Sequence, residues 1–140
     1  METRDPPRRQ LIERLMAQHP EKVADAAIDL WEPMAAKIIS IVGEDGFNSL
    51  YARSVFLAQP TFPWLAASAL SQQTDQRFAE LKKRLEGQTP SQAREANSLL
   101  LVTFTGILAE LIGEPITARI LGSAWGDDAS TSTSKEFKHE

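Results

Sequence analysis

Residues Leu99 to Ile112 read Leu-Leu-Leu-Val-Thr-Phe-Thr-Gly-Ile-Leu-Ala-Glu-Leu-Ile. The apolar run is interrupted by the polar side chains of Thr103, Thr105 and Glu110. A helix that is apolar on nearly every face has to be covered by other elements. The run is also shorter than the roughly 20 residues that span a bilayer. We therefore predict an all-α, single-domain bundle of five or six helices around a central apolar helix over residues 96–113.

Composition narrows the class of protein further. The chain has 140 residues, the length of one domain, and no cysteine for a disulfide or a thiolate metal site. Its formal net charge of -4 argues against a nucleic-acid partner, which requires a basic surface. The charged, proline-containing start carries no apolar signal segment. We expect a cytoplasmic protein that binds neither nucleic acid nor membrane.

Three helices are predicted before the first proline-rich corner, over residues 5–18, 21–42 and 45–58. The second keeps one apolar face on both sides of Pro33, with a spacing of three and four residues. This pattern predicts one helix kinked at Pro33, because proline cannot complete the helical hydrogen bond to Asp29. Two helices joined at Glu32 are the alternative. The face consists of Val23, Ala27, Leu30, Met34, Ile38 and Ile41.

The second half of the chain is divided by prolines and glycines. Residues 64–86 contain neither and predict one long helix, with a break near Thr74 as the alternative. Thr89 or Ser91 can cap the central helix, Gly113 can end it, and Pro115 can begin a last short helix. The bundle domain is thus placed at residues 1–126. Residues 127–140 form an acidic and Ser/Thr-rich tail that we expect to be disordered.

A four-residue pattern occurs twice, as Ile41-Val42-Gly43-Glu44 and Leu111-Ile112-Gly113-Glu114. Each copy ends a long predicted helix and begins a shorter one. One interpretation is a helical pseudo-repeat; the other is that Gly-Glu suits the end of one helix and the start of the next. Arg53 and Arg119 follow the two copies, and we expect each to pair with Glu44 or Glu114.

Motifs that would identify an enzyme are absent from the sequence. There is no glycine-rich phosphate loop, no Gly-x-Ser-x-Gly elbow and no inward Glu-x-x-His pair for a di-iron site. We predict no catalytic residue, no cofactor and no metal ligand. An enzyme that uses only the carboxylates of Glu44, Asp45 and Glu110 would require at least two of them to meet in one cleft.

The aromatic residues are the most suggestive candidates for binding. Phe62 and Trp64 flank Pro63 at a corner and Trp125 lies near the end of the last helix, so all three are candidate partner-binding residues. The alternative is that they close the open ends of the core. Trp31 and Met34 lie beside the Pro33 kink and are candidates to line a small apolar pocket there.

The sequence favours a non-catalytic helical module for protein–protein interaction or regulation. We expect it to form a homodimer and to bind a protein partner whose identity the sequence does not reveal. A binding module for a small apolar ligand, held near the Pro33 kink, is the alternative function. The carboxylate-only enzyme is the second alternative and is less favoured, since no other catalytic groups are present.

Overall fold

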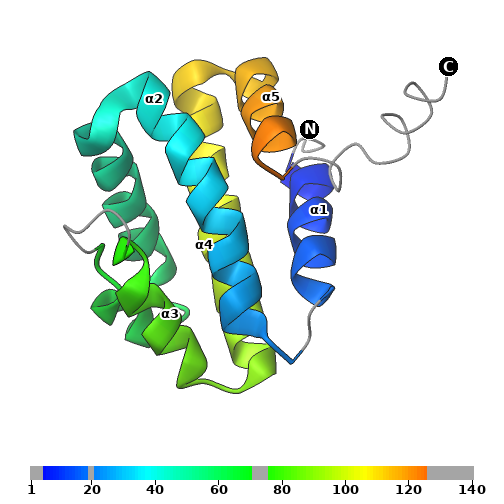
Figure 1. The fold of residues 1–140 in the computed structure, drawn as a ribbon, viewed down its shortest axis with the longest axis vertical. Helices are drawn as coiled ribbons and strands as arrows, with labels where there is room; N and C mark the ends of the chain where they lie inside the picture. Colours follow the sequence, from blue (N-terminus) through cyan, green and yellow to red (C-terminus); the bar gives the residue numbers. More distant parts are fainter. Residues whose placement is uncertain (1–4, 19–20, 71–75, 126–140) are drawn as a thin grey trace, which may run out of the picture.

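The computed structural model describes residues 5–18, 21–70 and 76–125, and every element within them is helical (Figure 1). The elements are α1 (Asp5–Ala17), α2 (Val23–Ala58), the 3-10 helix η1 (Pro63–Ala67), α3 (Ala79–Glu86), α4 (Pro90–Ile112) and α5 (Glu114–Trp125). The predicted all-α bundle is confirmed. The predicted tail over residues 127–140 lies outside the described residues.

Helix α4 is the central element and packs against α1, α2, α3 and α5. The Thr89 side chain caps it by accepting a hydrogen bond from the backbone N–H of Gln92. Inside the apolar run, the Thr105 hydroxyl donates to the carbonyl of Leu101 at 2.8 Å, which satisfies a buried polar group within the helix. By length and composition alone, helix α4 could cross a membrane. Half of its most apolar 18-residue stretch is buried within the bundle.

Helix α2 runs through Pro33 without interruption, so the alternative of two helices joined at Glu32 is excluded. The non-helical residue within α2 is Gly43, with φ 85° and ψ 165°. The dihedral angles at Pro33 are therefore helical, and the kink expected there stays a prediction. Gly43 separates a first half, residues 23–42, from a second half, residues 44–58, and the chain reverses there (Figure 1). These halves correspond to the second and third predicted helices.

The single long helix predicted over residues 64–86 is wrong. Helix η1 ends at Ala67, and α3 begins only at Ala79. Ser68 has non-helical dihedral angles, φ −102° and ψ 42°, and its backbone N–H closes a tight turn on Leu65. Its carbonyl also accepts a hydrogen bond from the Tyr51 hydroxyl. The possible break near Thr74 falls in residues 71–75, outside the described part of the chain.

The two Gly-Glu corners share a backbone conformation. Gly113 has φ 95° and ψ 151°, close to the values at Gly43, and both glycines end one helical segment directly before another. Both corners lie at the upper end of the bundle in Figure 1. The expected partner of Glu44 is different, however, because its carboxylate pairs with Arg77 rather than with Arg53 or Arg119.

Candidate functional site

Trp31 and Met34, the residues predicted to line a pocket, are completely buried. The Trp31 ring lies 5.3–5.5 Å from the rings of Tyr51, Phe78 and Phe104, measured between centroids. Its Nε1 donates a hydrogen bond to Asn97 at 2.8 Å. Aromatic rings therefore fill the space beside Trp31 in which we expected a ligand.

The three aromatic residues predicted to bind a partner have different surroundings. Trp125 is buried, and its Nε1 donates to the carbonyl of Leu30 at 2.9 Å. Phe62 is also buried, whereas Trp64 is half-buried and their rings are in edge contact. Burial of Trp125 and Phe62 favours the alternative that these side chains close the core. A partner contact at Trp64 stays a prediction.

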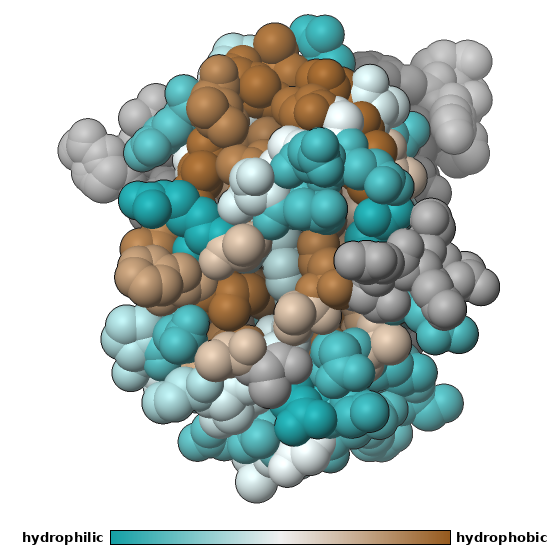
Figure 2. Space-filling view, turned by 90° about the vertical axis from the view of Figure 1, so that its left-hand side faces the viewer, coloured by the Kyte–Doolittle hydropathy of each residue, from teal (hydrophilic) through white to brown (hydrophobic). Residues whose placement is uncertain are grey.

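Large apolar side chains are exposed at the end of the bundle that carries both glycine corners. Ile41, Leu111 and Ile116 are 54%, 64% and 45% exposed, and they come from the ends of α2 (first half), α4 and α5. We call these three residues the apolar end. Figure 2 shows apolar side chains gathered at this upper end. We expected the whole run of residues 99–112 to be shielded from water, and the exposure of Leu111 shows that this is wrong at that residue.

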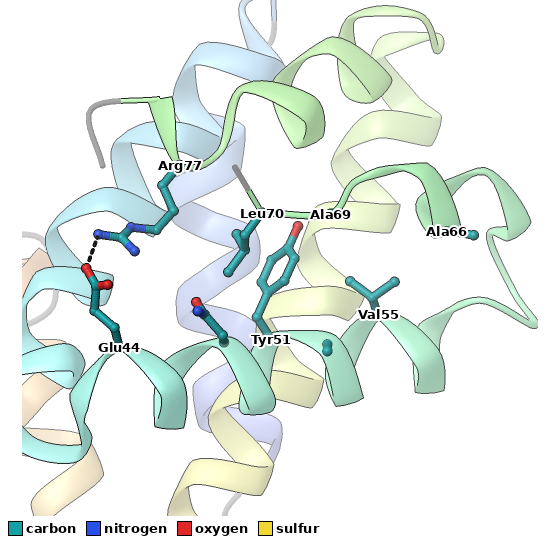
Figure 3. A pocket seen from close by; sticks show the side chains of 9 residues that line it. Glu44, Tyr51, Val55, Ala66, Ala69, Leu70 and Arg77 are labelled. Carbon is teal, nitrogen blue, oxygen red and sulfur yellow. Dashed lines mark ion pairs between the residues drawn. The ribbon is translucent and has the colours of Figure 1, made fainter. Parts of the chain in front are cut away.

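A pocket of about 640 Å³ lies along the second half of α2 (Figure 3). Its volume is within the range of small-molecule sites, roughly 300–1,000 Å³. One wall is a single face of the second half of α2. The opposite wall comes from η1, the segment that follows it, and Arg77, which lies two residues before α3. The lining residues are Glu44, Asn48, Tyr51, Ala52, Val55, Ala66, Ala69, Leu70 and Arg77.

The two ends of the pocket differ in polarity: one is charged and the other is lined by apolar side chains. Arg77 and Glu44 form an ion pair of 3.5 Å at one end, and Val55 and Ala66 lie at the other (Figure 3). The Arg77 side chain is 12% exposed, whereas that of Glu44 is 58% exposed. The Arg77 side chain is therefore largely enclosed by the fold, whereas most of the Glu44 side chain is in contact with water. The Tyr51 hydroxyl donates to the carbonyl of Ser68 at 2.8 Å, which fixes the ring in the pocket wall.

Of the three carboxylates of the enzyme hypothesis, Glu44 lines the pocket and Asp45 and Glu110 do not. Glu44 pairs with Arg77, and Glu110 is exposed on the last turn of α4. Asp45 is exposed beside Glu44 at the start of the second half of α2. Within residues 5–18, 21–70 and 76–125, no group of three or more His, Asp or Glu side chains could hold a metal ion.

Sequence reasoning missed the pocket and its arginine. One wall carries a recognisable signal, because Glu44, Asn48, Tyr51, Ala52 and Val55 recur at helical spacing and combine polar with small side chains. The other wall depends on how η1 and the segment around Arg77 fold back onto α2. That arrangement is tertiary and leaves no local pattern in the sequence.

Burial of Tyr51 raises the pKa of its hydroxyl above its ordinary value near 10. In the unfolded chain this tyrosine ionises near pH 10, whereas in the folded chain it keeps its proton. The unfolded state therefore binds fewer protons above pH 10, and the free energy of unfolding falls as the pH rises.

We expect the free energy of unfolding to fall between pH 10 and 12 by up to about 1.4 kcal/mol per pH unit from this residue. Urea titrations across that range measure it, and Tyr51→Phe should reduce the slope. Tyr51 is the sole tyrosine, so tyrosinate absorbance reports on it alone. Ionisation of the folded protein near pH 10 would contradict the prediction.

No protein-family model, curated protein or solved structure matches the chain. A function can therefore be argued only from the residues and their geometry. We base that argument on the apolar end and on the pocket beside Arg77. Phe56 and Leu57 are also exposed, on the second half of α2.

Proposed function

We propose that this chain is a non-catalytic helical interaction module that associates with a second copy of itself through the apolar end. The observation that carries the proposal is the exposure of Ile41, Leu111 and Ile116 at one end of the bundle. Monomeric soluble proteins rarely leave large contiguous apolar patches in water, and such patches commonly mark an interface. Burial of these side chains against a second copy would remove them from water.

The partner that we infer is a second copy of the same chain. Most soluble oligomers are symmetric, and in a two-fold dimer each copy contributes the same patch. Lys37, Glu110 and Arg119 are exposed near these apolar residues along the same three helices. A margin with both signs of charge does not repel an identical surface, and it resembles the polar rim that surrounds an apolar interface.

Light scattering on the full chain at two concentrations tests the proposal. We expect a dimer, and we expect Leu111→Glu to weaken association by at least about 30-fold, the effect of a residue that contributes about 2 kcal/mol or more at an interface. Phe56→Glu is the matched control, because Phe56 is 66% exposed and lies on the second half of α2, away from the apolar end.

Circular dichroism must show that both variants keep their helicity. A monomer at every concentration overturns the proposal. A dimer that Leu111→Glu leaves intact also overturns it, since a different surface would then form the interface.

A further inference from the structure

We propose that the pocket along the second half of α2 binds an amino acid with an apolar side chain, whose carboxylate meets Arg77 and whose ammonium group meets Glu44. This inference is independent of self-association, because none of the residues of the apolar end lines the pocket. It rests on the charges at one end of the pocket and on the apolar wall beyond them.

Arg77 is the group that would recognise a carboxylate. Its side chain is 12% exposed, and among the described residues its ion-pair partner is Glu44, at a distance of 3.5 Å. A guanidinium offers five N–H donors in a planar fork, and this arrangement matches the two oxygens of a carboxylate. Among the described residues, a single ion pair of 3.5 Å leaves most of these N–H donors without an acceptor.

Glu44 decides which carboxylate fits. A plain organic anion on Arg77 would be repelled by the neighbouring carboxylate of Glu44. An amino acid carries a positive charge beside its negative one, so it can lie antiparallel to the Arg77–Glu44 pair, with opposite charges adjacent at both contacts. Because Glu44 is mostly exposed, its side chain can adjust to the ammonium group at little cost in packing.

The remaining walls would receive the side chain of the amino acid. Asn48 and Tyr51 line the pocket between the charged pair and this region, where the lining side chains are apolar: Ala52, Val55, Ala66, Ala69 and Leu70. Glu44 and Val55 are eleven residues apart in the helix, so the wall extends roughly 16 Å, at about 1.5 Å per residue. This length accommodates a large apolar side chain such as the benzyl group of phenylalanine.

Three probes of similar shape test the assignment. Phenylalanine carries both charges, 3-phenylpropanoate lacks the ammonium group and 2-phenylethylamine lacks the carboxylate. We expect titration calorimetry on the full chain to show that phenylalanine binds at least about tenfold more tightly than either analogue, since each loses one charged hydrogen-bonded contact. Amide NMR shifts induced by phenylalanine should concentrate at Asn48, Ala52, Val55 and Ala69.

Two variants test whether Arg77 binds the carboxylate of the amino acid and Glu44 its ammonium group. Arg77→Gln should weaken phenylalanine binding at least about tenfold. Arg53→Gln is the matched control, because Arg53 is exposed on the same half of α2 and does not line the pocket. Glu44→Gln should weaken phenylalanine binding but not that of 3-phenylpropanoate, and the exposure of Glu44 makes this variant suitable even if Arg77→Gln does not fold.

Binding of 3-phenylpropanoate as tight as that of phenylalanine overturns the role of Glu44. Absence of binding by all three probes overturns the site, as do amide shifts confined to another part of the molecule. Since these are binding measurements, their failure is distinguishable from failure of the dimer, which light scattering reports.

Discussion

Replacing Trp31 with alanine will lower the free energy of unfolding by about 3–5 kcal/mol. The Trp31 side chain has no exposed surface and contacts three other aromatic rings, from both halves of the chain. Its loss leaves a cavity among rings that cannot all move inward, and it leaves the buried Asn97 amide without the indole donor. Urea denaturation followed by circular dichroism measures the change.

Trp31→Phe separates the two contributions. It retains an aromatic ring but removes the Nε1–H that Asn97 accepts, so we expect a cost of about 1–3 kcal/mol. Trp64→Ala provides a comparison at a half-buried tryptophan and should cost less than Trp31→Ala. Equal destabilisation by Trp31→Ala and Trp64→Ala would show that the aromatic cluster is not the centre of the core.

Replacing Gly43 with alanine will destabilise the fold by about 1–3 kcal/mol through backbone conformation alone. The dihedral angles at Gly43, φ 85° and ψ 165°, lie in a region that is essentially restricted to glycine. Apart from the neighbouring backbone, a Cβ placed there would have no atom within 4 Å, so contact with the rest of the fold does not contribute. The same denaturation experiment measures the cost.

Gly122→Ala is the matched control and should have the opposite sign. Gly122 lies within α5, its φ is not positive, and an added Cβ would again meet nothing within 4 Å. Alanine loses less conformational entropy than glycine in a helix, so we expect stabilisation by about 0.5–1 kcal/mol. A stabilising effect of alanine at Gly43 would contradict the conformation assigned to that corner.

Local signals in the sequence were sufficient for most of the fold. The apolar run of residues 99–112 predicted the central helix because few other arrangements cover so many apolar side chains. Of the two predicted cap residues, Thr89 caps α4, and Gly113 ends the helix as predicted, since capping and left-handed backbone depend on single residues. The helix begins at Pro90, earlier than the predicted range of 96–113. Continuity through Pro33 followed from the unbroken helical spacing on its two sides.

Features that depend on distant contacts escaped the same reasoning. The end of η1 at Ala67 depends on Ser68, whose carbonyl accepts from Tyr51, a residue 17 positions earlier. Leu111 and Ile41 belong to regular apolar patterns, yet they lie beyond the reach of neighbouring helices at the end of the bundle. The pocket was missed for a similar reason, because Arg77 and Glu44 are brought together only by the folded chain.

The buried amide of Asn97 has a consequence for how the helices are aligned. On α4 it accepts from Trp31 of α2 and directs its Nδ2 at the sulfur of Met16 in α1, 3.2 Å away. If either neighbour slid along α4 by one helical turn, this amide would remain in hydrocarbon with fewer partners, at a cost of roughly 1–3 kcal/mol. One polar side chain thus favours a single axial register among three helices.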